Sequence, residues 1–369
     1  MAILSANVEE ANMKAAVCYE FNKPLVVEDL DIDAPQKGEV KVKMAATAVC
    51  HSDIHFITGD MGGKVPFVPG HESSGYIEQI GEGVTSVKVG DPVVLSLLRS
   101  CGTCLYCRTG RPNMCETKWP LDTESRLHNK RGQSIAHGVR VASLAEYAIV
   151  DKSQVVPISA DMPMDRAALL ACGVITGFGA VVNRARVQPM SSVVVIGVGG
   201  VGLNSIQGAA IAGAYPIIAV DTLDRKLEAA RRFGATHTVN SKSGDPVAAV
   251  KALTEGRGAD YIFVTVGVTE CVRQGLSMSA KRGMTVVVGL ATQDLTSNPM
   301  EFIDGEKMLT GSFMGSTNLA VDIPKLVSLY KGGILKLDEL ITGRYPLDRI
   351  NDAIESVVKG EALRNVITF

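Results

Sequence analysis

Short apolar runs separated by turn residues dominate the first half of the chain. Runs at 14–19, 39–44, 75–80 and 144–150 have the length and the flanking Gly, Pro and Asp residues that are typical of β-strands. The stretch 121–141 is polar and irregular, and it predicts a surface loop. The first half of the chain is therefore predicted to be mainly β.

The second half of the chain has a different pattern, in which short, wholly apolar runs that are typical of buried strands alternate with helical segments. Strands are predicted at 193–196, 217–220, 261–264 and 285–288, with helices such as 225–233 between them. Such alternation is typical of an α/β doubly wound parallel sheet. A helix over 164–182 leads into this region, and the segment 321–369 is predicted to be helical with a closing strand at 366–369.

Length and charge narrow the class of protein. A chain of 369 residues is long enough for two domains, each with its own core. The formal net charge of -2 gives no basic footprint, so a nucleic-acid partner is not expected. Residues 1–12 lack a targeting pattern, which makes the cytoplasm the default location. The charge-free run 187–220 is not read as a membrane span because Gly, Asn, Gln and Pro interrupt it.

Four of the eight cysteines fall in one short segment, at Cys101, Cys104, Cys107 and Cys115. Four thiolates close a tetrahedral zinc shell and leave no position for a substrate, so this set predicts a structural zinc site. A pair of disulfides is the alternative, and the lack of an export signal makes it the less favoured one.

A second group of possible metal ligands lies between residues 50 and 72, where thiol, imidazole and carboxylate side chains are concentrated. Catalytic zinc sites usually take three protein ligands and keep a fourth position open. Cys50 and His71 could supply two of them, and Cys172 could supply the third from far along the chain. Each residue taken singly is also compatible with an ordinary buried side chain.

A glycine fingerprint follows the predicted strand 193–196. It comprises Gly197, Gly199, Gly200, Val201 and Gly202, and the next strand ends at Asp221. Glycines of this spacing let the backbone approach a pyrophosphate at a helix N-terminus, and the acid binds the ribose 2′-hydroxyl. The pattern therefore predicts NAD binding, and the carboxylate disfavours the 2′-phosphate of NADP.

With these motifs in view, the chain resembles the zinc-dependent medium-chain alcohol dehydrogenases over nearly its whole length. The resemblance includes the segments 50–53 and 70–72, the four-cysteine lobe, Cys172, the glycine fingerprint and the end 363–369. It implies a GroES-like catalytic domain at 1–175 with a structural zinc lobe near 98–117. A Rossmann domain at 176–318 would follow, and 319–369 would return to the catalytic domain.

The resemblance also implies roles for individual side chains. Cys50, His71 and Cys172 would hold a catalytic zinc, with Asp53 orienting His71 and Glu72 near the metal. Ser52 would accept the alcohol proton, and His55 would end a proton relay. NAD would lie in the cleft between the domains. The residues expected to touch it, besides the fingerprint, are His51, Thr176, Lys226 and Arg364.

For the substrate, the expectation is a primary or otherwise accessible alcohol with an apolar or aromatic body, or the matching aldehyde. The expected pocket residues are Met61, Leu97, Met114, Trp119 and Leu290. In the glutathione-dependent class III branch, acidic residues match 61–63 and an Arg matches Trp119, and both are missing here.

Three alternatives stay open. A glutathione site could be rebuilt from Arg111, Lys118 or Arg126, which would make the protein a class III-like formaldehyde dehydrogenase. A non-catalytic NAD(H)-binding sensor would keep the fold and use zinc only structurally. The presence of Cys50, His71, Cys172 and Ser52 argues against this sensor.

The loop between 115 and 144 resembles the longer version in dimeric family members, so a homodimer is expected. A tetramer is the alternative.

Overall fold

The structure is a computed structural model that describes residues 11–369. The chain divides into two compact units. The first unit comprises the described residues up to Cys172 together with Leu319–Val327 and Leu337–Phe369. The second unit comprises Gly173–Asn318 and Ser328–Lys336. The chain therefore leaves the first unit after Cys172 and returns to it at more than one point.

The first unit is rich in strands, as the short apolar runs predict. Its strands are β1 (Ala11–Val17), β2 (Val26–Ile32), β3 (Glu39–Ala48), β4 (Phe67–Val68), β5 (Ser73–Ile80), β6 (Pro92–Leu95), β7 (Leu127–Asn129), β8 (Ser134–His137), β9 (Tyr147–Asp151), β10 (Val155–Pro157), β17 (Ile341–Pro346) and β18 (Arg364–Thr368). Its helices are α1 (His51–Thr58), α2 (Leu105–Arg108), α3 (Met164–Leu169), most of α10 (Leu319–Lys331) and α11 (Ile350–Val358).

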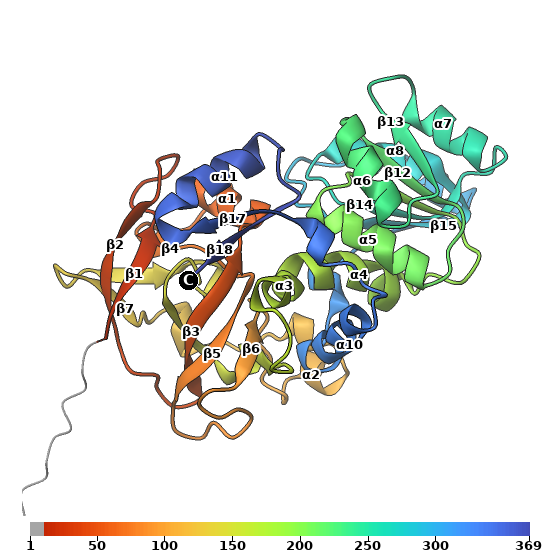
Figure 1. Cartoon of the computed structure of the whole chain (residues 1–369). Coiled ribbons are helices and arrows are strands. Elements are labelled where there is room, and N and C mark those ends of the chain that lie inside the picture. The colour runs from red at the N-terminus through yellow and green to blue at the C-terminus, as the bar shows by residue number, and fades with distance from the viewer. Residues whose placement is uncertain (1–10) are drawn as a thin grey trace, which may run out of the picture. The chain divides into compact units, whose positions relative to one another are not determined.

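These strands form two sheets. One has the order β1-β2-β7-β8-β4, and the other has the order β10-β6-β5-β3-β18-β17 with β9 also paired to β3. The C-terminal strand β18 runs antiparallel to β3, with Val366 opposite Ala48, and the two lie side by side in Figure 1. The end of the chain is thereby fixed beside the strand that leads to Cys50.

The predicted surface loop at 121–141 is wrong, because part of it is the β7–β8 hairpin. Leu127 and Ile135 face each other across this hairpin and are completely buried. Arg126 is also buried, and its Nη2 donates to Glu39 Oε1 at 2.8 Å. The polar residues around these positions hide the apolar pair from a reading of composition, since a strand of three residues is too short for a clear alternation.

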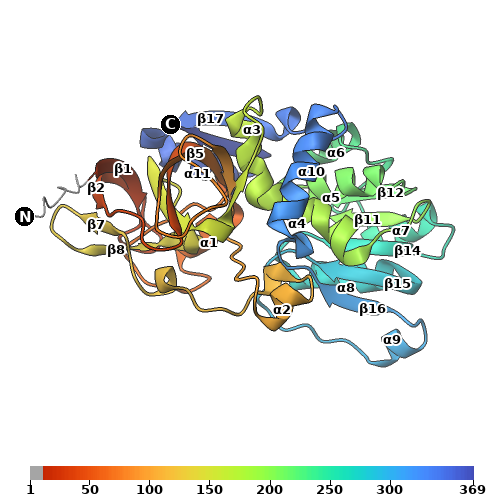
Figure 2. The same ribbon diagram turned by 90° about the horizontal axis from the view of Figure 1, so that it is seen from below.

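The second unit is the predicted doubly wound α/β sheet. Its strands are β11 (Val193–Ile196), β12 (Ile217–Asp221), β13 (His237–Asn240), β14 (Ala259–Val264), β15 (Ser279–Val287) and β16 (Met308–Gly311). Its helices include α4 (Ile175–Gly179), α5 (Gly200–Ile211), α6 (Asp224–Arg232), α7 (Pro246–Leu253), α8 (Thr269–Met278) and α9 (Met300–Ile303). All strand pairs are parallel, in the order β13-β12-β11-β14-β15-β16, and Figure 2 shows β14, β15 and β16 in sequence toward one edge.

This strand order reverses direction at β11, which is where α/β sheets of the dinucleotide-binding type place their ligand. Strand β11 is buried along its whole length, which explains its unbroken apolar sequence. The predicted fold class is confirmed.

The helix expected at 164–182 is present and runs on as the helical segment Met164–Ala185. Among the described residues it is the one helix long and apolar enough to cross a membrane, and 78% of its most apolar window is buried. Two stretches of it, Leu170–Val174 and Ala180–Ala185, have π-helical hydrogen bonding. Such turns occur frequently at functional sites, and the first of them carries Cys172.

Candidate functional site

Cys50 stands at the junction between β3 and α1, where it is the N-cap residue of the helix. Asp53, three residues on, accepts the backbone N–H of Cys50 through Oδ2 at 3.2 Å. This is the reciprocal half of a capping box, so the same carboxylate that starts the helix also fixes the backbone of the thiol residue.

Asp53 also fixes His71. Its Oδ1 accepts the backbone N–H of Gly70 at 2.9 Å and lies 2.9 Å from His71 Nδ1. Gly70 has φ of +100°, and a Cβ there would lie 2.6 Å from the backbone nitrogen of Leu144. Only glycine fits this turn. With Nδ1 engaged, the imidazole presents Nε2 to Cys172 Sγ at 3.3 Å.

Cys50, His71 and Cys172 are all buried, and their ligand atoms lie within 4.8 Å of one another. A hydrogen bond with Cys172 lowers the pKa of the Cys50 thiol well below its usual value, and His71 lowers it further against the opposing effect of burial. Burial by itself lowers the pKa of His71, but the charge and hydrogen bond of Asp53 and those of Cys50 together outweigh burial and raise this pKa well above its usual value. Two thiols and an imidazole in one buried cluster form a donor set that suits zinc.

A buried ion pair lies in the same unit. Arg364 is 5% exposed and its Nη2 donates to Oε1 of the fully buried Glu72 at 2.9 Å. Burial lowers the pKa of the guanidinium, but the negative charges of Glu72, Cys50 and Cys172 raise it by more. Arg364 therefore stays charged and offsets the charge of the cysteine cluster, a partnership that the sequence did not suggest.

The residues expected to move a proton lie on α1. Ser52 Oγ is 3.7 Å from Cys50 Sγ. The His55 side chain is 42% exposed, and its Nδ1 lies 3.2 Å from Asp60 Oδ2, which also accepts from Thr58. Asp60 is thus a partner of His55 that sequence reasoning missed, although the spacing of five residues around a helix end is a usable signal. Its pKa is lowered, chiefly by the hydrogen bond from Thr58 and then by that from His55.

The four-cysteine lobe surrounds α2. The Sγ atoms of Cys101 and Cys107 are 4.0 Å apart, and those of Cys104 and Cys115 are 3.9 Å apart. A tetrahedral shell with Zn–S bonds of about 2.3 Å places sulfurs about 3.8 Å apart, whereas a disulfide needs about 2.05 Å. All four cysteines are free thiols that fit zinc.

Backbone N–H groups support the lobe sulfurs. Cys101 Sγ accepts from the backbone of Cys104 at 3.2 Å and of Thr103 at 3.4 Å. Hydrogen bonds from Thr117 and then Thr103 lower the pKa of Cys101 to about 5, whereas burial raises that of Cys107 to about 12.

A buried arginine, Arg99, links the two ends of the four-cysteine segment, and this role was not evident from the sequence. Arg99 donates through Nη1 to Asp122 at 2.7 Å and through Nε to Gln154 at 2.7 Å. Arg99 precedes the cysteines and Asp122 follows them, so the pair joins the two ends of the segment.

The glycine fingerprint forms the turn between β11 and α5. Gly197 has φ of +87°, and a Cβ on Gly202 would lie 1.9 Å from the carbonyl oxygen of Gly197. A Cβ on Gly199 would meet nothing within 4 Å, so this glycine faces open space. Asp221 Oδ2 accepts the backbone N–H of Val198 at 2.8 Å, which ties the end of β12 to the turn.

The other residues expected at the cofactor fall in both units. In the second unit, Thr176 is buried with Oγ1 3.7 Å from Met314 Sδ, Val201 is the second residue of α5 and Lys226 is half-buried on α6. In the first unit, His51 is exposed at the start of α1.

The residues expected to line a substrate pocket are partly exposed. Met61 is 40% exposed and Met114 43%, while Leu97 and Trp119 are half-buried in the same unit. Leu290 belongs to the second unit and is 44% exposed.

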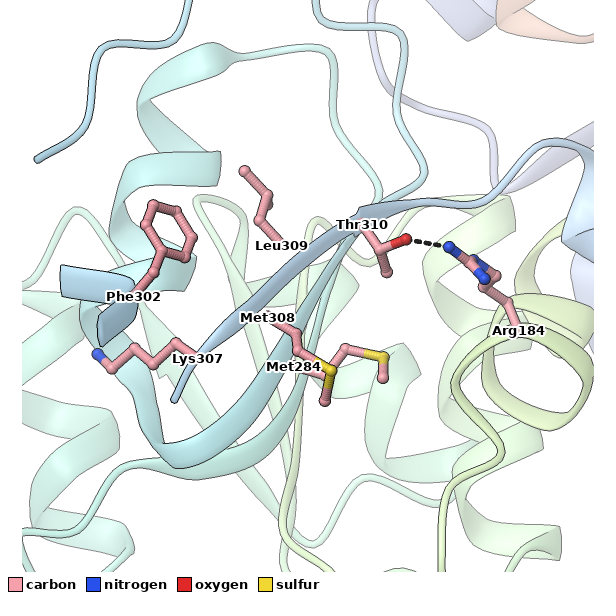
Figure 3. Close-up of a pocket in the computed structure, with 7 residues that line it drawn as sticks. All are labelled: Arg184, Met284, Phe302, Lys307, Met308, Leu309 and Thr310. Carbon is pink, nitrogen blue, oxygen red and sulfur yellow. Dashed lines mark hydrogen bonds between the residues drawn. The ribbon is translucent and has the colours of Figure 1, made fainter. Parts of the chain in front are cut away.

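A depression of about 640 Å³ lies elsewhere, along the edge strand β16 (Figure 3). It is lined by Arg184, Met284, Phe302, Lys307, Met308, Leu309 and Thr310. None of the expected substrate residues takes part in it.

Comparisons with known proteins agree with this architecture. Residues 36–160 match the alcohol dehydrogenase GroES-like domain, and residues 200–331 match the zinc-binding dehydrogenase domain. The NDMA-dependent alcohol dehydrogenase of Amycolatopsis methanolica is 39% identical, over 96% of this chain and 98% of its own. The S-(hydroxymethyl)glutathione dehydrogenase of Saccharomyces cerevisiae is 37% identical, over 96% and 95%.

A solved structure is also close. The crystal structure of benzyl alcohol dehydrogenase from Acinetobacter calcoaceticus superposes with a TM-score of 0.91 at 35% identity, covering 97% of this chain and 99% of that one. The chain therefore belongs to the zinc-dependent medium-chain alcohol dehydrogenase family, with a GroES-like domain and a Rossmann-type sheet. It is an alcohol dehydrogenase, as the resemblance in the sequence implied.

Proposed function

We propose that the protein is an NAD-dependent, zinc-containing alcohol dehydrogenase that interconverts primary alcohols and aldehydes. The observation that carries this proposal is the buried cluster of Cys50, His71 and Cys172 with the Ser52 hydroxyl beside it. A non-catalytic sensor would need neither a buried three-ligand set nor a hydroxyl next to it.

In this proposal Cys50, His71 and Cys172 hold the catalytic zinc, and the four lobe cysteines hold a structural one. When bound, the metal supplies Lewis-acid polarisation of the alcohol oxygen and the nicotinamide supplies a hydride acceptor. Asp53 keeps His71 in the tautomer that frees Nε2 for a metal. Ser52 takes the proton of the alcohol, and His55 passes it toward solvent, to which its side chain is open.

Two zinc ions per subunit follow from this assignment, one for each cluster. Elemental analysis of protein prepared without chelators measures them directly. One ion or none would remove the assignment of the missing site.

The cofactor should be NAD, because Asp221 places a carboxylate at the end of β12, where the adenine-side ribose is bound in such sheets. A ribose 2′-hydroxyl can donate to this group, and a 2′-phosphate is repelled by it. Equal catalytic efficiency with NAD and NADP would contradict this part of the proposal. The initial rates should be repeated with NDMA as the electron acceptor, since one relative is named for its dependence on it.

For the substrate we propose an alcohol with an apolar or aromatic body. Trp119 and Met61 carry no charge for a glutathione carboxylate, and a lost charge-assisted bond costs about tenfold to a hundredfold in binding. Of the cations that could rebuild such a site, Arg126 is buried against Glu39 and Glu124. Arg111 and Lys118 remain exposed.

One of the relatives acts on S-(hydroxymethyl)glutathione and another on benzyl alcohol, by their names. The deciding experiment compares kcat/KM for S-hydroxymethylglutathione with kcat/KM for benzyl alcohol and a medium-chain alcohol. A clear preference for the glutathione adduct would establish the class III-like alternative.

We further propose a cytoplasmic homodimer, with domain borders near 175 and 318. Besides the segment 115–144, the edge strand β16 supports the proposed dimer, because it presents exposed apolar side chains to which a second copy of the chain could bind. Met308 on this strand is 47% exposed, and Phe313 just after it is 48% exposed. An unpaired edge of this kind is a template for pairing. Sedimentation as a tetramer would contradict the dimer.

A further inference from the structure

Helix α5 contains a polar group of side chains where a core helix is expected to be apolar. Asn204 and Ser205 are fully buried, and Gln207 is 3% exposed. Burying such groups is unfavourable unless they are hydrogen-bonded. Their partners therefore indicate why the sequence keeps them.

The two amides form a continuous chain of hydrogen bonds. Asn204 Nδ2 donates to the carbonyl oxygen of Gly200 at 2.7 Å, and its Oδ1 accepts from Gln207 Nε2 at 3.1 Å. The Gln207 amide also bonds to both backbone polar groups of Lys336. Its Oε1 accepts from the Lys336 N–H at 2.7 Å, and its Nε2 donates to the Lys336 carbonyl oxygen at 3.1 Å. The chain joins the glycine turn to Lys336, 136 positions further along the sequence than Gly200.

Lys336 occupies a special place in the chain, because it is the last residue of the second unit before the chain returns to the first. Its ammonium group donates to the carbonyl of Arg232, the last residue of α6. In the first unit, Asp338 accepts from Arg166 Nε at 2.7 Å, on the helix that leads to Cys172. We call residues 336–338 the crossing segment, because the chain passes from the second unit to the first within it. Hydrogen bonds hold this segment on both sides of Leu337, at Lys336 and at Asp338.

We propose that Asn204 and Gln207 are positioning residues that couple dinucleotide binding at the glycine turn to the conformation of the crossing segment at Lys336. This inference rests on the proposed cofactor site. A ligand seated on the turn favours the arrangement in which the Gly200 carbonyl accepts from Asn204, and this arrangement holds Gln207 on Lys336. Because such coupling is reciprocal, an ordered Lys336 also strengthens dinucleotide binding.

The backbone N–H of Lys336 is a direct reporter of this coupling. The amides of Gly332, Gly333, Ile334 and Leu335 bond to carbonyls near the end of α10, whereas that of Lys336 bonds to the Gln207 side chain. Hydrogen–deuterium exchange of the full-length protein, with and without NADH, isolates this amide as the difference between overlapping peptides. We expect NADH to slow its exchange by about fivefold or more, the lower end of typical coupling between two sites.

The variant Gln207→Met keeps the side-chain volume and removes both bonds to Lys336. We expect NADH to slow exchange at Lys336 by less than about twofold in this variant, and NADH to bind about fivefold more weakly. The matched control is Asn129→Leu, which removes another buried amide side chain, whose Oδ1 accepts the backbone N–H groups of Arg131 at 3.1 Å and Gln133 at 3.0 Å in the first unit. This control should keep the full effect of NADH.

The outcomes separate the two proposals. If NADH fluorescence detects no binding to the unaltered protein, the cofactor site and the coupling both fall. If NADH binds to the unaltered protein and hydrogen exchange at Lys336 does not change, only the coupling is overturned. This result does not depend on whether any variant folds. Full protection of the Lys336 amide by NADH in Gln207→Met would also overturn the coupling, and so would loss of this protection in the control Asn129→Leu.

Discussion

The two cysteine clusters have similar chemistry and opposite surroundings. Cys50, His71 and Cys172 are buried and come from three separate segments, whereas the four lobe cysteines are half-exposed and lie within fifteen residues. In the buried cluster the side chain of Asp53 fixes His71, and the buried pair of Arg364 with Glu72 lies in the same unit. The lobe sulfurs are held by nearby backbone N–H groups.

This difference explains what each cluster can do. A buried three-residue set leaves a coordination position open inside a water-poor environment, where a charge interacts strongly. A closed set of four thiols has no such position, and it can replace the apolar core that a short surface segment lacks. The first cluster should therefore control activity and the second local order.

The largest expected effect is on activity. Cys172→Ala should lower kcat/KM for alcohol oxidation by about a thousandfold or more and remove one zinc ion, since a metal supplies several kcal/mol of charge stabilisation. Cys18→Ala is the control, because Cys18 is also a buried free thiol and lies outside both clusters. Activity of Cys172→Ala within tenfold of the unaltered protein would refute the catalytic assignment.

The next test concerns the charge balance of the buried cluster. Arg364→Met leaves Glu72 buried without its guanidinium partner and should lower the free energy of unfolding by about 3 kcal/mol. Arg344→Met breaks a more exposed ion pair, with Asp165, and should cost less than about 1 kcal/mol. The free energy of unfolding of both variants is measured by urea denaturation. Equal decreases in the two variants would show that the buried ion pair contributes no more to stability than the exposed one.

For the lobe, Cys107→Ser should release one zinc ion and raise the rate of tryptic cleavage at the exposed Arg108 and Lys118 by about tenfold, because the segment loses its cross-link. Activity should fall much less than in Cys172→Ala. Cys271→Ser, which alters a thiol outside the lobe, should leave cleavage unchanged. Resistance to trypsin after zinc loss would mean that Arg99 and Asp122 hold the lobe without metal.

The smallest effect is expected at His55, which is near the buried cluster in sequence but open to solvent. His55→Ala should slow alcohol oxidation by roughly threefold to tenfold at neutral and lower pH, where a relay base matters most, and less at alkaline pH. His128→Ala, which removes another partly exposed histidine paired with a carboxylate, provides the comparison. An unchanged pH profile of kcat would argue against a relay.

Local sequence determined the features that depend on neighbours in the chain. The lobe cysteines and the glycine turn lie within short segments, so their spacing alone predicted a metal site and a strand–turn–helix unit. Strands β11 and β12 were equally visible, because a strand buried on both faces has an uninterrupted apolar sequence. The class of fold followed from the alternation of such runs with helices.

Tertiary structure decided everything that depends on distant partners. The pairing of Arg364 with Glu72 joins positions 292 residues apart, and the bond from Gln207 to Lys336 joins positions 129 apart. The β7–β8 hairpin was hidden because its strands are too short to show a period. A side chain's charge and hydrogen-bonding capacity are fixed by its type, but the group that satisfies it is chosen only when the fold removes both from water.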